Sequence, residues 1–286
     1  MRAEESTLAS DGQSLFTCRW LPGGDARAVV VIVHGYAEHC GRYEYVGTWL
    51  TERGYAVEAF DLRGHGKSPG RRAFVRSVDE YLDDLRAVLS DVRSRHGDTP
   101  IFLLGHSMGG GIVTLYVIRE QPDLAGVVLT GPAIRGRRSA PRPVLWLFRL
   151  VGRFLPKLRL TKLAAGDVSR DPEVVALYDA DPLNYRRGMP AGTLVAMIEA
   201  GREMNDTFEK FALPLLVIHG SEDALTDPEG SRQLVERASS GDKQLKVYNG
   251  LYHEVLNEPE KDEVLSEIAH WLDARVEAVL AASASA

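Results

Sequence analysis

Residues 99–120 read TPIFLLGHSMGGGIVTLYVIRE, and this stretch decides the fold. An apolar run, TPIFLL, leads into GHSMG at residues 105–109, and a helical pattern, GGIVTLYVIRE, follows. GHSMG has the form G-x-S-x-G, in which the glycines relieve the crowding of a sharp turn from strand to helix. Such a turn projects Ser107 from the carboxyl end of a sheet, beside the positive end of a helix dipole. We interpret Ser107 as a candidate nucleophile; the alternative is a Gly-rich packing turn with an incidental serine.

Short segments rich in Val, Ile and Leu recur along the chain, and helical patterns separate them. The predicted strands are 29–33, 56–60, 101–104, 126–130, 215–219 and 245–248. The predicted helices are 43–53, 78–95, 110–120, 230–238 and 263–279. The strands run apolar without alternation, so each is expected to be buried on both faces of a parallel sheet wrapped by helices. The sequence thus predicts an α/β fold, with the first twenty or so residues as an antiparallel hairpin at one edge.

The alternation of strand and helix fails between about Pro132 and Phe208. No strand-like run appears there, and Pro, Gly and Asp-Pro pairs separate helical patterns. We predict a helical cap at residues 133–207, inserted into a core made of residues 1–132 and 208–286. The clearest cap helix is expected to begin after Pro141 and Pro143 and to stop at Pro156.

The composition is that of an ordinary soluble globular protein, with 44% hydrophobic and 26% charged residues among 286. A net charge of -6 gives no support for nucleic-acid binding over the whole surface. The two cysteines, Cys18 and Cys40, cannot build a disulfide scaffold or a thiolate zinc cluster. The N-terminus lacks the apolar run of a signal peptide, and no apolar run is long enough for a membrane helix. We therefore expect a cytoplasmic protein, soluble or at most peripheral to membranes.

A serine nucleophile needs a base to take its proton, and the base needs a third group to fix its tautomer. In a fold of this kind the order along the chain should be serine, acid, histidine. His253 is the best base, since it lies in the loop between the last strand and the final helix. His219 ends a strand and is expected to pack or hydrogen-bond below the site, while His270 lies on an amphipathic helix.

The acid and the oxyanion donors are assigned by their positions directly after predicted strands and after Ser107. Asp223 comes first after the strand LPLLVIHG and is assigned the orienting role, whereas Asp227 precedes a proline and has the position of a helix N-cap. The backbone N–H of Met108, the residue after the nucleophile, should supply one oxyanion donor. Tyr36, in the loop after an earlier strand, should supply the other.

A second Gly-rich stretch, DLRGHGKSPG at residues 61–70, also follows a predicted strand. Its spacing is not that of a phosphate-binding P-loop. We interpret it as a structural loop that braces the floor of the site.

Five motifs, HGYAEHCGRY, DLRGHGKSPG, GHSMGG, GSEDALTD and LYHEVLNEP, occur in this order between Ala28 and Trp271. Together they resemble the monoacylglycerol lipase family of α/β-hydrolases, also described as a serine aminopeptidase/lysophospholipase-like group. The resemblance implies the α/β-hydrolase fold with a cap at the same place. It also implies hydrolysis of a monoacylglycerol to glycerol and a fatty acid through an acyl-serine intermediate, with no cofactor and no metal.

The catalytic residues of that family carry over onto Ser107, Asp223 and His253, and its oxyanion amides onto Tyr36 and Met108. Two departures from the family pattern occur: Tyr36 stands where relatives often carry a smaller residue, and the segment after His253 lacks a second histidine found in vertebrate members.

Glu38 and Arg42 match positions of the family motif HG-x-x-EH-x-x-RY on the glycerol side of the pocket. They are candidate ligands of the substrate headgroup, and a buried Glu–Arg pair that holds the oxyanion loop is an equal alternative. Lysophospholipase or broad-specificity carboxylesterase activity is the alternative function. A non-catalytic binding module of this fold is disfavoured by the complete set of Ser, Asp and His.

Residues 132–166 carry nine basic and no acidic residues. Arg149, Arg153 and Lys157 recur at four-residue spacing beside a broad apolar surface, a pattern typical of an interfacial helix that rests on lipid. Alternatively, the apolar surface packs over the site and leaves the arginines in solvent. The expected partners are a small lipid substrate and, through the cap, a membrane or lipid-droplet surface, with no nucleic acid.

Overall fold

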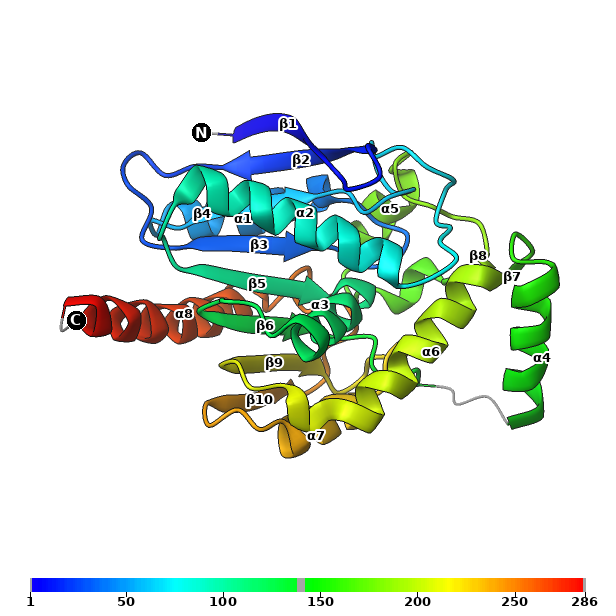
Figure 1. Ribbon diagram of the computed structural model, residues 1–286. Coiled ribbons are helices and arrows are strands. Elements are labelled where there is room, and N and C mark those ends of the chain that lie inside the picture. The colour runs from blue at the N-terminus through cyan, green and yellow to red at the C-terminus, as the bar shows by residue number, and fades with distance from the viewer. Residues whose placement is uncertain (1, 138–141, 285–286) are drawn as a thin grey trace.

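A computed structural model of the protein describes residues 2–137 and 142–284. Eight strands form one sheet in the order β1-β2-β4-β3-β5-β6-β9-β10 (Figure 1). The strands are β1 (Arg2–Leu8), β2 (Ser14–Trp20), β3 (Val29–Val33), β4 (Ala56–Phe60), β5 (Ile101–His106), β6 (Gly126–Thr130), β9 (Leu215–Gly220) and β10 (Lys243–Tyr248). β1 and β2 pair antiparallel at one edge, and all pairs from β4 to β10 are parallel. The predicted parallel sheet and the N-terminal hairpin are therefore confirmed.

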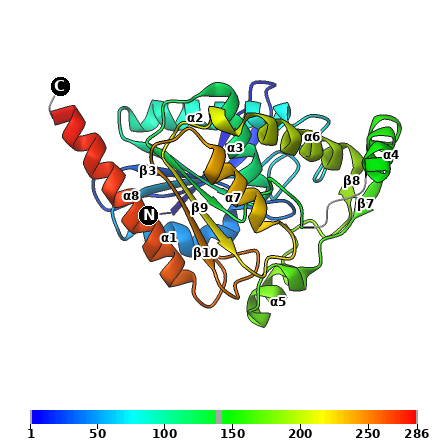
Figure 2. The same ribbon diagram turned by 90° about the horizontal axis from the view of Figure 1, so that it is seen from below.

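Helices cover both faces of the sheet (Figure 2). The core helices are α1 (Glu44–Thr51), α2 (Asp79–His96), α3 (Met108–Glu120), α7 (Pro228–Arg237) and α8 (Lys261–Ala284). α1 and α8 bury apolar side chains on one face, while α2, α3 and α7 bury theirs on the other. Both faces of the central strands are thereby removed from water, which explains their continuous apolar sequences.

The prediction that every strand is buried on both faces is wrong for β10. Its side chains are half-buried or exposed, because β10 is the last strand of the sheet and pairs only with β9.

The described part of the segment between β6 and β9 contains three α-helices and two short strands, besides 3₁₀ helices at Ala165–Asp167 and Phe208–Lys210. The α-helices and strands are α4 (Arg142–Phe154), β7 (Arg159–Thr161), α5 (Pro172–Ala180), β8 (Met189–Pro190) and α6 (Ala191–Thr207). The expectation of no strand here is corrected by the antiparallel pair β7 and β8, which is too short to leave an apolar run in the sequence. α4 begins before Pro143, not after it, because proline is tolerated in the first helical turn. The predicted boundary at Pro141 and the basic residue Arg138 lie outside the described residues.

α4 stands away from the sheet and packs against α6, which in turn packs on α3 (Figure 1). No helix within residues 2–137 and 142–284 combines the length and the apolar character that crossing a bilayer requires.

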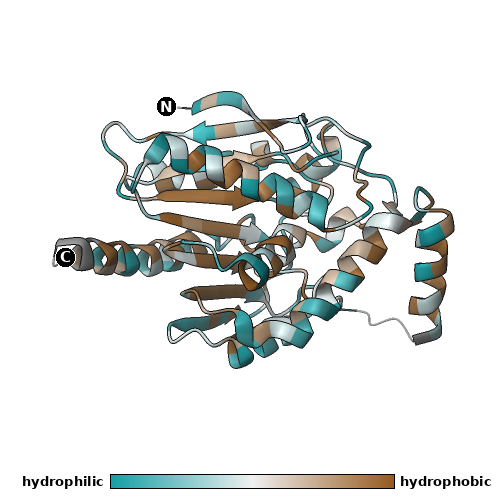
Figure 3. Cartoon of the chain, in the orientation of Figure 1, coloured by the Kyte–Doolittle hydropathy of each residue, from teal (hydrophilic) through white to brown (hydrophobic). Residues whose placement is uncertain are grey.

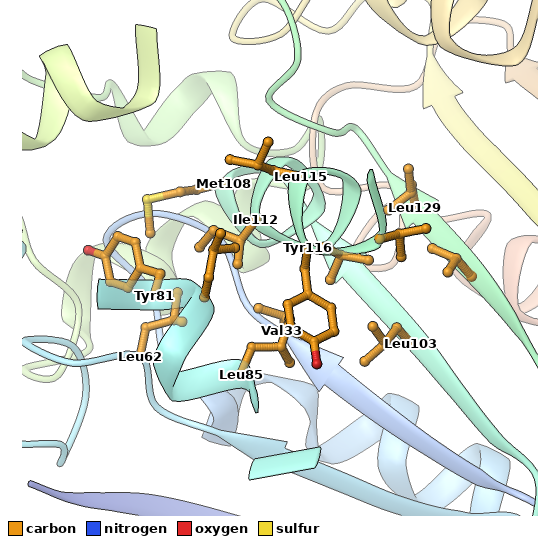
Figure 4. Packing of buried hydrophobic residues seen from close by; sticks show 14 of the residues in the cluster. Val33, Leu62, Tyr81, Leu85, Leu103, Met108, Ile112, Leu115, Tyr116 and Leu129 are labelled. Carbon is orange, nitrogen blue, oxygen red and sulfur yellow. The ribbon is translucent and has the colours of Figure 1, made fainter. Parts of the chain in front are cut away.

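α3 is anchored on the sheet by apolar side chains. Ile112 and Tyr116 of α3 pack against Val33 of β3 and Leu103 of β5 (Figure 4). A side chain at Gly109 in the first turn is impossible without movement, since its Cβ would lie 2.1 Å from the carbonyl oxygen of Val33. The N-terminus of α3 is therefore pressed against the end of β3, and the loop after β3 lies beside the turn that carries Ser107.

Candidate active site

Ser107 occupies the turn between β5 and α3 with a φ of 51° and a ψ of -118°, and a positive φ is uncommon for a residue other than glycine. The neighbouring backbone fixes it: its N–H donates to the carbonyl of Thr130 at 3.0 Å, and its carbonyl accepts from Ala133 N–H at 2.8 Å. A strained backbone that the surroundings hold in place is typical of a functional residue. The expected projection of Ser107 from the carboxyl end of the sheet is thus supported by local geometry.

Ser107, His253 and Asp223 come together although they lie in three separate loops. His253 Nε2 lies 2.8 Å from Ser107 Oγ, and His253 Nδ1 lies 2.7 Å from Asp223 Oδ2. The other carboxylate oxygen, Asp223 Oδ1, accepts from the N–H groups of Leu225 and Thr226 at 2.8 and 2.9 Å. Asp223 is consequently fixed in orientation and can hold the imidazole.

The protonation states suit a base that is ready to accept a proton. Burial raises the pKa of Asp223, but the charge of His253 and the hydrogen bonds from His219 and His253 lower it well below its usual range. Burial lowers the pKa of His253, but the charge and hydrogen bond of the Asp223 carboxylate, together with the charges of Glu254 and Glu38, raise it more, so the net shift is upward. An ionised Asp223 keeps the proton of neutral His253 on Nδ1 and leaves Nε2 free to accept the proton of Ser107.

His219, Asp227 and His270, which the sequence places outside the catalytic set, lie where it predicts. His219 is fully buried, with Nε2 3.1 Å from Asp223 Oδ2 and Nδ1 2.8 Å from Ser231 Oγ. Asp227 caps α7, since its side chain accepts from Glu229 N–H at 3.1 Å. His270 is exposed on α8.

The two residues predicted to supply the oxyanion donors lie at the start of α3 and in the loop after β3. Met108 is the first residue of α3, and the first N–H groups of a helix have no partner within it. Tyr36 follows Gly35 in the loop after β3, where Ala37 has a φ of 68°. Tyr36 and Met108 both line the cavity that contains Ser107.

A cavity of about 840 Å³ lies over Ser107. Near His253 it is bordered by Glu38, Glu254 and Tyr178. Toward the segment between β6 and β9, α4 and α6 supply the apolar lining residues Leu145, Phe148, Leu194, Met197 and Ile198, while the C-terminal part of α6 adds the polar residues Arg202, Asn205 and Asp206. A stretch of apolar lining beside polar groups fits an amphiphilic molecule. In the part of the chain that the structure describes, no three His, Cys, Asp or Glu side chains are grouped to hold a metal ion.

A family model described as serine aminopeptidase, S33, matches residues 24–260. The chain belongs to this family. The monoacylglycerol lipase of Mycolicibacterium smegmatis is 41% identical over 95% of this chain and 97% of its own length. The monoglyceride lipase of Mus musculus is 34% identical over 94% of this chain and 90% of its own. The crystal structure of Paleococcus ferrophilus monoacylglycerol lipase has a TM-score of 0.82 at 32% identity, covering 91% of this chain and 99% of that one. The resemblance to this family and the α/β-hydrolase fold are confirmed.

In this member of the serine aminopeptidase family, Glu38 and Arg42 pair with each other inside the protein. Glu38 Oε2 accepts from Arg42 Nη1 at 2.9 Å, and Glu38 Oε1 accepts from Gly35 N–H at 2.6 Å. Burial raises the pKa of Glu38, but the charge of Arg42, the nearby His106 and His34 and the hydrogen bond from Gly35 N–H together lower it more, so the carboxylate is ionised. These contacts favour the alternative of a buried pair that holds the oxyanion loop over that of two direct headgroup ligands.

Two residues at the site were not among the sequence candidates. Glu254 accepts a bidentate hydrogen bond from Arg42, and the only signal for it is its place directly after His253. His106 lies 4.9 Å from His253 between ring centroids, and its Nδ1 lies 3.0 Å from the carbonyl oxygen of Thr130. Burial, followed by the charge of His253, lowers the pKa of His106, so this ring supports His253 as a neutral neighbour.

The loop of residues 61–70 has the bracing role that its sequence predicts. Asp61 Oδ1 accepts from Cys40 N–H at 2.7 Å, and Asp61 Oδ2 accepts from Lys67 N–H at 2.6 Å. Gly66 is required here, because a Cβ on it would lie 2.0 Å from Asp61 Oδ2. The loop thereby fixes the chain just after the oxyanion loop. Cys40 and Cys18 are both free and buried, with their sulfur atoms 3.4 Å apart.

Proposed function

We propose that the protein is a monoacylglycerol lipase, a serine hydrolase that cleaves the ester bond of a monoacylglycerol to give glycerol and a free fatty acid. The observation that carries the proposal is the 2.8 Å contact of Ser107 Oγ with His253 Nε2 at the wall of a largely apolar cavity. The monoacylglycerol lipases among its relatives support the substrate class.

In the proposed mechanism His253 Nε2 takes the proton of Ser107 as Oγ attacks the ester carbonyl carbon. The negative charge that forms on the carbonyl oxygen accepts hydrogen bonds from Tyr36 N–H and Met108 N–H. His253 then gives its proton to the glycerol oxygen, the C–O bond breaks, and the acyl group stays on Ser107. Water repeats the sequence: His253 takes a water proton, the oxygen attacks the acyl carbon, and the proton returns to Ser107 as the fatty acid leaves. Asp223 holds the imidazole throughout.

Because His253 must give its proton to the leaving oxygen, its position determines how the substrate lies in the cavity. Its Nε2 must reach the leaving oxygen, so glycerol lies on the side of the cavity bordered by Glu38, Glu254 and Tyr178. The acyl chain then extends along the apolar wall formed by α4 and α6.

The charges on the glycerol side favour a neutral alcohol over the phosphate of a lysophospholipid. Glu38 and Glu254 contribute two carboxylates, and Arg42 is already hydrogen-bonded to both. Arg42, the one cation among these three residues, is therefore already paired and is not free to bind a phosphate.

We expect kcat/KM for a monoacylglycerol to exceed that for lysophosphatidic acid of the same acyl chain by at least about tenfold, since opposed like charges cost several kcal/mol. Fatty-acid release measured below the micellar concentration of each lipid tests this. A p-nitrophenyl ester of the same chain is the control that has no headgroup. Equal rates on the two lipids would favour the lysophospholipase alternative, and a marked preference for the p-nitrophenyl ester would favour a general carboxylesterase.

We also expect the activity to fall as the pH decreases through the pKa of His253, because a protonated imidazole cannot accept the proton of Ser107. Since that pKa is raised, the midpoint of the acid limb of kcat/KM should lie above the ordinary histidine value of 6.5. A pH–rate profile on a neutral monoacylglycerol measures the midpoint, with circular dichroism at each pH as the control for folding. A midpoint below the ordinary value contradicts the assignment of His253 as the base.

For the domain organisation we propose a cap at residues 133–207 over a core of residues 1–132 and 208–286. Leu145 and Phe148 of α4, together with Met197 and Ile198 of α6, supply a wall of the cavity that contains Ser107. A substrate would reach Ser107 beside these side chains, and their apolar character suits an acyl chain.

We further propose that the cap contacts anionic lipid surfaces through α4 and the turn that follows. Large apolar side chains are exposed there, and Trp146 and Phe154 are 64% and 68% exposed. Figure 3 shows hydrophobic and hydrophilic residues alternating along α4 at the side of the molecule. Arg149, Arg153 and Lys157 are exposed on the same segment. Exposed apolar side chains beside basic ones are typical of a helix at a lipid interface.

Changing Arg149, Arg153 and Lys157 together to Gln should weaken binding to anionic vesicles about a hundredfold, because each basic residue near such a surface contributes about 1 kcal/mol. Co-sedimentation with phosphatidylglycerol vesicles measures the binding, and phosphatidylcholine vesicles show what the apolar residues contribute alone. A matched control changes Arg232, Arg237 and Lys246, which are exposed on the core, to Gln. Equal loss in the two triple variants would assign the effect to net charge and overturn the proposal.

A further inference from the structure

Two loops far apart in the sequence meet at the active site. Residues 34–42 follow β3 and contain Tyr36, while residues 249–260 follow β10 and contain His253. Arg42 joins them: its Nη1 and Nη2 donate to Glu254 Oε1 and Oε2, both at 2.7 Å. Such a bidentate pair fixes orientation as well as distance. The two loops are thus connected through the residue that directly follows His253.

Glu38 extends this connection to the oxyanion loop. Its Oε2 accepts from Arg42 Nη1 at 2.9 Å, and its Oε1 accepts from the N–H of Gly35 at 2.6 Å and from the hydroxyl of Tyr43 at 2.9 Å. Gly35 directly precedes Tyr36. A chain of charge-assisted hydrogen bonds therefore runs from the residue after His253 to the residue before Tyr36.

Glu38 and Glu254 are buried, the Arg42 side chain is only 11% exposed, and all three charged groups have close partners. Glu38 and Glu254 are 4% and 5% exposed. Arg42 lies against the ring of Tyr178, 4.8 Å from its centroid, and Glu254 Oε2 also accepts from Asn257 Nδ2 at 2.8 Å. Burying three charges is costly, and apolar side chains of similar volume often stabilise a fold as well or better. Stability alone is therefore a poor explanation for this group, whereas fixed geometry between the loops is a good one.

The backbone of the oxyanion loop, residues 34–42, is strained and needs contacts that hold it in place. Ala37, next to Tyr36, has a φ of 68°, which costs free energy for any residue with a side chain. Relaxation of that backbone would turn the Tyr36 N–H relative to Ser107 and His253. Losing one oxyanion donor lowers kcat about 10²- to 10³-fold, and a displacement of about 1 Å can cost about 10²-fold.

We propose that Glu254, Arg42 and Glu38 form an ionic bridge that sets the position of the Tyr36 N–H relative to His253. These are positioning residues that act through the two loops. The inference deepens the proposed function and rests on its serine chemistry, but not on monoacylglycerol as the substrate.

The test is Glu254→Gln, which keeps the side-chain length and one acceptor but removes the charge. The rate of acyl-enzyme formation is measured in a stopped-flow burst with p-nitrophenyl butyrate, on enzyme counted by fluorophosphonate titration. We expect the acylation rate to fall about tenfold to a hundredfold while KM changes less than about threefold, because the lost interaction serves the transition state. A merely structural role would lower Tm without this separation of kcat from KM.

Glu258→Gln is the matched control. Glu258 is a buried carboxylate in the same loop; it accepts from Arg170 Nε at 2.7 Å, from Arg170 N–H at 2.9 Å and from Tyr252 N–H at 3.4 Å, so it reports effects on the His253 loop that do not pass through the oxyanion loop. Among the described residues, none of the hydrogen bonds of Glu258 reaches the oxyanion loop, residues 34–42. Comparable acylation rates in Glu254→Gln and Glu258→Gln would overturn the proposal.

Arg42→Lys is the second variant, since lysine keeps the charge and loses the bidentate geometry. It should slow acylation in the same direction, and its combination with Glu254→Gln should cost less than the product of the two single effects. Fully multiplicative effects would overturn the bridge. If the wild type forms the acyl-enzyme but does not cleave monoacylglycerols, the proposed substrate fails and the bridge is still tested. If the wild type is not acylated at Ser107, both fail.

Discussion

Replacing Ser107 by Ala is expected to lower kcat for monoacylglycerol hydrolysis by at least about 10⁴-fold and to abolish labelling by a fluorophosphonate. The change removes only Oγ, the atom that lies 2.8 Å from His253 Nε2. Residual activity over water is expected from the oxyanion donors and from binding. The backbone bonds of Ser107 to Thr130 and Ala133 do not involve the side chain, so Tm should change little.

The control for this experiment is Ser266→Ala on α8, where the hydroxyl donates to the carbonyl of Asp262, one turn earlier. This variant should be labelled and should turn over like the wild type. Mass spectrometry of the labelled protein locates the phosphonate. Attachment to a serine other than Ser107, or undiminished labelling of Ser107→Ala, would contradict the assignment of the nucleophile.

The parts of the site that could be predicted from the sequence are those set by local geometry and chain order. The glycines around Ser107 specify a strand-to-helix turn whatever surrounds it, and Gly109 does face the carbonyl of Val33 as such a turn requires. Asp223 and Asp227 could be told apart because an aspartate before a proline is a typical N-cap. His253 could be chosen over His219 because only its loop follows the last strand.

The parts that could not be predicted depend on contacts between distant segments. Glu254 and Arg42 are 212 residues apart in the sequence, and no local pattern around either residue predicts that they are bonded. Whether Arg42 is a headgroup ligand or half of a buried pair could be decided only once the structure showed that Glu254 also bonds to it. The half-exposed character of β10 follows from its position at the edge of the sheet, which the apolar residues Leu245 and Val247 do not reveal.

Asp223→Asn is expected to lower kcat about 10³- to 10⁴-fold while leaving the protein folded. The reason is specific to the contacts of this carboxylate. Oδ1 accepts from two backbone N–H groups, of Leu225 and Thr226, so the oxygen of the new amide must take that place. Its NH₂ group then occupies the place of Oδ2, 2.7 Å from His253 Nδ1, and donates to it. The imidazole proton must move to Nε2, and in that tautomer His253 cannot accept the proton of Ser107.

Asp227→Asn is the matched control, because it is the same change in the same loop and asparagine caps a helix as well as aspartate does. It should retain the wild-type kcat within about twofold, since a helix cap contributes to stability and not to the proton transfer. Steady-state kinetics on one monoacylglycerol, with Tm measured for both variants, makes the comparison. If Asp223→Asn kept kcat within about tenfold of Asp227→Asn, the carboxylate would not be fixing the tautomer of His253. The ionised Asp223 and the raised pKa of His253 would then be consequences of burial beside each other, without a part in catalysis.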